Sequence, residues 1–67
     1  MDISLNGAPR HTASARLADL LTDCAIDSGK PGIAIAINDA IVPRAKWADV
    51  LLQAGDSVEI VRPHSGG

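Results

Sequence analysis

The sequence has 67 residues and a formal net charge of -2, and 46% of its residues are hydrophobic, with one Trp and no Phe or Tyr. A chain of this length forms one small domain with an aliphatic core and leaves little room for an enclosed substrate pocket. Its slightly acidic balance argues against nucleic-acid binding, which uses a basic surface.

Other broad features restrict where such a protein works. No segment approaches the roughly 20 apolar residues of a membrane-spanning helix. The first residues, Met1-Asp2-Ile3-Ser4, lack the basic stretch of a signal peptide. The single cysteine cannot form an internal disulfide. We therefore expect a cytoplasmic protein that does not bind a membrane.

The first predicted elements form a hairpin. Residues 1–5 alternate apolar and polar side chains, the pattern of a half-buried strand. Asn6-Gly7 follows, and this pair favours a tight two-residue hairpin turn because both residues tolerate positive φ. A second strand is expected over residues 8–12, with Pro9 at its start or on a sheet edge because it lacks an N–H.

A helix is predicted next, from about Ala15 to Ser28. Its apolar residues recur on one helical face, and they are Leu17, Leu20, Leu21 and Cys24. Ser14 is the expected N-cap, because its hydroxyl can accept a bond from a free backbone N–H. Gly29 is expected just beyond the end of the helix, and Pro31 prevents the helix from continuing.

The second half of the sequence is predicted to be mostly strand. Residues 33–37 alternate Ile with Ala, so we expect a strand whose isoleucines face the helix and whose small alanines leave a shallow face for a partner. The remaining elements are a turn at 38–40, a short strand at 41–43, an irregular turn at 44–47, core positions at 50–52, a turn at 55–56 and a last strand at 58–62.

This order of elements predicts an α+β fold. A hairpin, a crossing helix and further strands give a mixed sheet of four to five strands with one main helix across one face. That is the β-grasp (ubiquitin-like) arrangement. The expected organisation is a domain over residues 1–63 followed by a flexible C-terminal tail over residues 64–67, which contains the diglycine Gly66-Gly67. A fold alone does not establish a function.

Residues 36–47, Ala-Ile-Asn-Asp-Ala-Ile-Val-Pro-Arg-Ala-Lys-Trp, resemble the signature of the ThiS family of thiamine-biosynthesis sulfur carriers. In that family an apolar strand ends in Ala-Ile-Asn or similar, and Val-Pro-Arg, two variable residues and Trp follow. Gly55-Asp56, the following strand and the diglycine also resemble it, so the resemblance covers residues 33–67. Two departures are Arg16, where family members often carry Thr or Ser, and the polar Pro63-His64-Ser65 before the diglycine.

The resemblance implies a protein co-substrate rather than an enzyme. The Gly67 carboxylate would be adenylated by an E1-like enzyme of the ThiF/MoeB type and converted to a thiocarboxylate. A thiazole synthase of the ThiG type would accept the sulfur. ATP and Mg²⁺ would belong to the activating enzyme, so no cofactor or metal is expected on this chain. Gly66 would let the tail enter a narrow site, because glycine has no Cβ.

Several residues are candidates for contact with these partners. They are Ile41, Ile60, Arg62, Pro63, His64 and Ser65. Within the signature, we expect Trp47 to cover the end of an aromatic-poor core and Arg44 to pair with a nearby carboxylate. Cys24 is interpreted as a small core residue. His11 and His64 lack the spacing of metal ligands.

Three alternatives remain open at this level. The chain could carry sulfur for another pathway, such as molybdopterin, cysteine, thiosugar or tRNA thiolation. It could be a ubiquitin-like modifier that forms isopeptide bonds with lysines. It could also be a binding module in which the diglycine has no chemical role.

Overall fold

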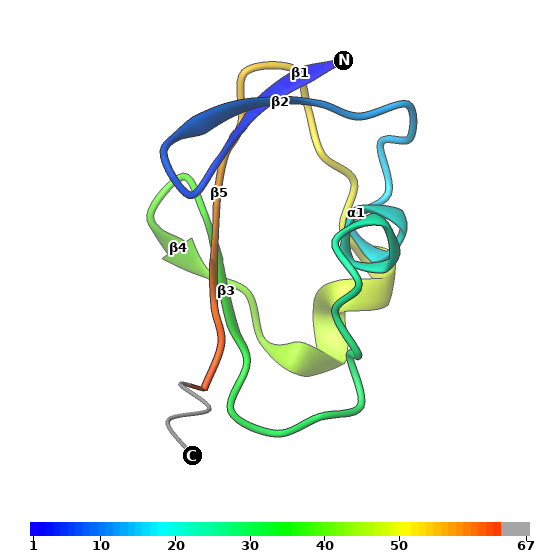
Figure 1. Cartoon of the computed structure of the whole chain (residues 1–67), viewed down its shortest axis with the longest axis vertical. Coiled ribbons are helices and arrows are strands. Elements are labelled where there is room, and N and C mark those ends of the chain that lie inside the picture. Colours follow the sequence, from blue (N-terminus) through cyan, green and yellow to red (C-terminus); the bar gives the residue numbers. More distant parts are fainter. Residues whose placement is uncertain (64–67) are drawn as a thin grey trace.

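The computed structural model describes residues 1–63. A five-stranded sheet packs against a short α-helix and a 3₁₀ helix that lie together on one of its faces (Figure 1). The strands are β1 (Asp2–Leu5), β2 (Ala8–His11), β3 (Ala34–Ile37), β4 (Ala40–Ile41) and β5 (Ser57–Val61), and the helices are α1 (Leu17–Asp23) and η1 (Arg44–Asp49). This architecture confirms the predicted α+β fold.

The sheet is mixed, with strand order β2-β1-β5-β3-β4. Its central pair, β1 and β5, is parallel, with Ser4 opposite Ser57 and Leu5 opposite Val58. The other pairs are antiparallel. The first and last strands of the sequence therefore lie side by side in the middle of the sheet, and β5 is held from both sides.

Two tight turns connect the hairpins. Asn6 and Gly7 have φ of 51° and 82°, which is the type I′ geometry that their sequence favours. Asn38 and Asp39 have φ of 50° and 69°, so the β3–β4 turn has the same form. As a result β4 begins at Ala40, one residue earlier than the predicted strand at 41–43, and ends at Ile41.

The predicted helix over 15–28 was too long, because α1 ends at Asp23. Ala25 adopts φ of 57° directly after the cap residue Cys24. The N–H of Ala25 then donates to the Thr22 carbonyl at 3.0 Å, and the N–H of Ile26 donates to the Leu21 carbonyl at 2.9 Å. These two bonds form a Schellman motif, so Ala25 fills the position expected for Gly29.

The start of α1 also differs from the prediction. Arg16 is the N-cap and makes no side-chain cap bond. Ser14 lies two residues earlier, where its hydroxyl accepts from the Arg16 N–H at 3.1 Å and donates to Asp19 at 2.6 Å. Arg16 is positioned instead by its β-bridge to Leu51. The residue at which the helix begins is thus set by tertiary pairing rather than by a capping side chain.

The core lies between the sheet and the two helices. It comprises Ile3, Leu17, Leu20, Leu21, Ile26, Ile35, Trp47, Leu52, Val58 and Ile60. Ile35 of β3 is fully buried, and Ile33 and Ile37 pack against the core, as the alternating pattern predicted. Residues 44–49 form η1 rather than an irregular turn, and η1 places Trp47 inside. Of the expected core positions 50–52, Leu51 is instead 69% exposed.

Candidate functional site

The last strand determines where the predicted tail starts. Along β5 the side chains alternate, with Val58 and Ile60 buried and Ser57, Glu59 and Val61 exposed. Ile60 was predicted to contact a partner, but its side chain is only 8% exposed and belongs to the core. That expectation was wrong, because the alternation of side chains along β5 turns Val58 and Ile60 toward the core. Val61, at 61% exposed, lies on the outer face instead.

The outer face of the sheet is shallow and partly apolar. Ile41 is 71% exposed and lies opposite Ala36, which in turn lies opposite Glu59. In the next row Ala34 lies opposite Val61. We call Ile41, Ala36, Ala34 and Val61 the outer apolar face. Its small alanines agree with the predicted shallow surface, and the exposed residue Arg62 follows Val61 directly.

Two asparagines attach β5 to the neighbouring hairpins. The Asn6 carboxamide accepts from the Ile60 N–H at 2.8 Å and donates to the Ile60 carbonyl at 3.3 Å. Near the other end of β5, Asn38 accepts from the Ser57 N–H at 2.9 Å and donates to Asp56 at 3.0 Å. The Asn6 side chain thereby continues the pairing of β1 with β5 beyond Leu5. The turn chemistry predicted both hairpin turns but not these contacts.

The strand ends against a loop that joins α1 to β3. Gly32 in this loop has φ of +85°, and a Cβ added there would lie 2.7 Å from Cγ of Pro63. Pro63 and Arg62 also line a depression of about 290 Å³ with the loop residues Lys30 and Ile33. Sequence reasoning missed Gly32; its only signal was a glycine placed between Pro31 and a strand.

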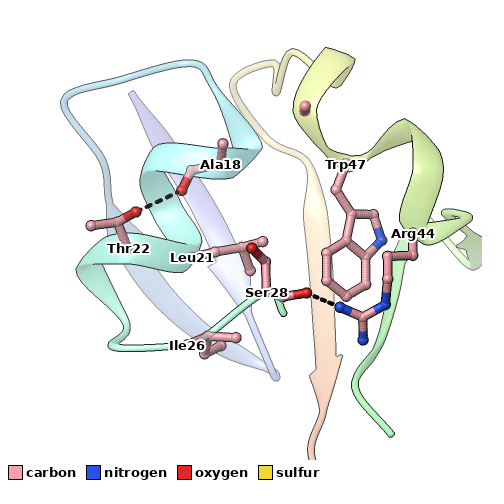
Figure 2. Close-up of a pocket in the computed structure, with 8 residues that line it drawn as sticks. Ala18, Leu21, Thr22, Ile26, Ser28, Arg44 and Trp47 are labelled. Carbon is pink, nitrogen blue, oxygen red and sulfur yellow. Dashed lines mark hydrogen bonds between the residues drawn. The ribbon is translucent and has the colours of Figure 1, made fainter. Parts of the chain in front are cut away.

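The Val-Pro-Arg-x-x-Trp segment supports the same loop. Trp47 is buried and its indole N–H donates to the Val42 carbonyl at 2.9 Å. The Arg44 guanidinium lies 4.3 Å from the centre of the Trp47 ring. Its two terminal nitrogens donate to the carbonyls of Ser28 and, at 2.6 Å, Lys30. Figure 2 shows Arg44 next to Trp47. Both residues line a depression of about 250 Å³.

This geometry confirms one expectation and corrects another. Trp47 does cover one end of the core. Arg44 was expected to pair with a carboxylate, but its partners are the two backbone carbonyls. Carbonyls that point out of a loop need donors, and the planar guanidinium can serve two of them at once.

The remaining predicted residues are dispersed or lie outside the described part of the chain. Arg62 and Pro63 are exposed at the end of β5. His64, Ser65, Gly66 and Gly67 lie outside the described residues. Cys24 is half-buried and packs against the core. Within residues 1–63 no cluster of three metal-ligating side chains occurs, and no helix there is long and apolar enough to span a membrane.

One ion pair lies on the hairpin of β1 and β2. His11 Nδ1 and the Asp2 carboxylate are 2.9 Å apart and both side chains are exposed. The hydrogen bond from His11 and its charge hold the pKa of Asp2 below the usual value of 3.8. This pair joins β1 to β2 across the edge of the sheet, so it has no evident part in presenting the tail.

Comparison with known proteins connects these features. The model of the ThiS family matches residues 3–67, which include the signature, β5 and the diglycine. The chain belongs to the ThiS family. The ThiS match extends over nearly the whole sequence, whereas the resemblance read from the residues began at Ile33.

Two relatives support the assignment. The sulfur carrier protein ThiS of Escherichia coli K12 is 40% identical over 42 residues, which are 63% of this chain and 64% of that protein. The match thus spans less than two thirds of that relative. A crystal structure of the thiamine biosynthesis protein ThiS from Geobacter metallireducens aligns over all of both chains with a TM-score of 0.79 and 21% identity. This second likeness confirms the β-grasp fold.

Proposed function

We propose that this protein is a sulfur carrier whose Gly67 carboxylate is activated and converted to a thiocarboxylate for thiazole formation in thiamine biosynthesis. The observation that carries the proposal is the ThiS family match over residues 3–67, which reaches the diglycine. The protein acts as a co-substrate and supplies no catalytic group of its own. The position of β5 supports this role, because a central strand is a firm base for a reactive segment.

The chemistry begins with an ionised carboxylate, since an α-carboxyl group has a pKa near 3.3–3.7. One carboxylate oxygen attacks the α-phosphorus of ATP in the activating enzyme, and pyrophosphate leaves. A persulfide sulfur then attacks the acyl-adenylate carbon and displaces AMP. A thiol cleaves the resulting acyl disulfide, which leaves a thiocarboxylate on Gly67 and a disulfide on the donor side.

The partners follow from these steps. An E1-like adenylating enzyme of the ThiF/MoeB type supplies the ATP and Mg²⁺ sites, and a thiazole synthase of the ThiG type accepts the sulfur. We propose that both dock on the outer apolar face and on Arg62 and Pro63, with His64 and Ser65 entering the partner's cleft. Exposure of Ile41 and Val61 supports this surface.

The experiment for the reaction is a mass measurement. The protein is incubated with its cognate activating enzyme, ATP and a sulfur donor, and its intact mass is recorded. We expect the gain that corresponds to exchange of one oxygen for sulfur, located at Gly67 by fragmentation. A variant without Gly67 should show no gain. Absence of the exchange in the unaltered protein would refute the proposal.

The same mixture separates the alternatives. Thiol-resistant conjugates to lysines would indicate a ubiquitin-like modifier. A thiocarboxylate that is formed but not consumed by a thiazole synthase would indicate a carrier for another pathway. Docking is tested with Arg62→Glu, which should weaken binding to the activating enzyme, against Arg16→Glu. Arg16 is also exposed but lies at the start of α1, so equal weakening by both variants would argue against the proposed surface.

A further inference from the structure

The packing of Pro63 against Gly32 leaves no room for a side chain at position 32. The ring of Pro63 occupies space that any side chain at position 32 would need, because a Cβ there would be 2.7 Å from Pro63 Cγ. Gly32 also has φ of +85°, a conformation that L side chains rarely adopt. Pro63 lies two residues beyond the end of β5, so this contact joins the α1–β3 loop, residues 24–33, to the segment that follows the last strand.

The loop is itself fastened, so it can serve as a fixed support. Asp27 accepts the Lys30 N–H at 3.0 Å through its carbonyl and the Gly29 N–H at 2.9 Å through its carboxylate. Arg44 donates to the carbonyls of Ser28 and Lys30. Arg44 in turn stacks on Trp47, which is anchored in the core. A continuous set of contacts therefore runs from the core through the loop to Gly32 and Pro63.

We propose that Gly32 is a positioning residue for the tail. Its missing side chain lets Pro63 seat against the α1–β3 loop, and this seat fixes the point from which residues 64–67 extend toward the activating enzyme. Arg44 and Trp47 act indirectly, because their contacts hold the α1–β3 loop in place. This inference rests on the proposed function, but the contact itself is testable without it.

The size of the effect follows from the geometry. In Gly32→Ala, the new Cβ and Pro63 Cγ must move apart by at least about 0.7 Å, from 2.7 Å to ordinary van der Waals contact at 3.4 Å. Displacement of a reacting group by about 1 Å can cost about 100-fold in rate. We therefore expect Gly32→Ala to lower kcat for adenylation by about tenfold or more. The KM for the carrier should change less than kcat, because Pro63 is the only part of the proposed docking surface that Gly32→Ala displaces.

The chain provides a matched control. Gly55 has φ of +88°, but a Cβ added there would meet nothing within 4 Å. Gly55→Ala therefore carries the same backbone penalty without a collision at the tail. Its kcat should stay within about twofold of the unaltered protein. Equal kcat values for Gly32→Ala and Gly55→Ala would overturn the inference.

Two further variants guard against misfolding of Gly32→Ala. Pro63→Ala removes Cγ from an exposed residue and should itself lower kcat. Combining it with Gly32→Ala should cost no more than Pro63→Ala alone, because the colliding atom is gone; this non-additivity is measured as a double-mutant cycle. An unchanged kcat for Pro63→Ala, or strict additivity of the two changes, would contradict the proposed seat.

A spectroscopic measurement separates this inference from the proposed function. In the unaltered protein, nuclear Overhauser effects should connect the Gly32 Hα protons with the Pro63 ring protons, and Gly32→Ala should abolish them. Absence of these effects in the unaltered protein would overturn the inference even if adenylation proceeds. Their presence without any adenylation would refute the proposed function and leave the contact standing.

Discussion

Asn6 and Asn38 offer an internal comparison of two nearly matched contacts. Each is the first of the two central residues of a type I′ turn, with φ of 51° and 50°. Each carboxamide accepts a hydrogen bond from a backbone N–H of β5. The bonds of Asn6 to Ile60 are partly buried, whereas those of Asn38 to Ser57 and Asp56 are exposed. Replacing each asparagine with alanine therefore isolates the effect of burial.

The conformational cost of alanine at positive φ, about 1–2 kcal/mol, is common to both variants and cancels. Asn6→Ala leaves the Ile60 N–H without its acceptor in a partly buried place, which costs about 1–3 kcal/mol. At Asn38 water can replace the lost partner, so we expect about 0.5–1 kcal/mol there. Asn6→Ala should thus lower the free energy of unfolding by about 1–2 kcal/mol more than Asn38→Ala.

Thermal and urea unfolding of the two variants measure this difference. For a domain of this size the expected gap in Tm is roughly 5–15 °C. Native-state hydrogen exchange adds a local readout, because the Ile60 amide should lose protection in Asn6→Ala and keep it in Asn38→Ala. Equal destabilisation, or unchanged protection of the Ile60 amide in Asn6→Ala, would refute the reasoning.

Three other predictions concern positions where the chain departs from common local chemistry. Ala25→Gly should raise the free energy of unfolding by about 0.5–1 kcal/mol, because glycine fits the left-handed C′ position; a lower Tm would contradict the Schellman assignment. Arg16→Ser should stabilise by about 1 kcal/mol in urea unfolding by supplying the missing N-cap acceptor, and no gain would mean that the β-bridge to Leu51 alone fixes the start of α1. The depressed pKa of Asp2 means that its contribution to stability is present above pH 3.8 and is lost as the pH falls through its folded-state pKa. An NMR titration should find the Asp2 pKa below 3.8, and His11→Ala should return it toward that value; an unchanged pKa would exclude His11 as the cause.

The sequence predicted those parts of the fold that depend on local chemistry. Asn6-Gly7 specified its turn because the two residues together tolerate positive φ. The Ile and Ala alternation specified β3 and the side of β3 that faces the core. The diglycine and the signature specified the family, which the match over residues 3–67 confirmed.

Features that depend on distant partners were predicted less well. The end of α1 was placed at Ser28 because Gly29 is a usual helix terminator, yet Ala25 accepts the left-handed conformation once Ile26 can pack in the core. Ile60 was placed on the surface because residues 58–61 are mostly apolar, so the sequence alone does not show which side chains of this strand face the core. Arg44 was expected to pair with a carboxylate. Its actual partners are carbonyls of the α1–β3 loop, and no local sequence pattern shows that this loop lies beside Arg44.

The central place of β5 has a mechanical consequence. A strand that ends a chain at the edge of a sheet can peel away one hydrogen bond at a time. Here β5 is bonded to β1 on one side and to β3 on the other, and it runs parallel to β1. A pull on Pro63 along the strand loads both ladders in shear, so many bonds must break together. A partner can therefore draw on the end of this chain without unravelling the domain behind it.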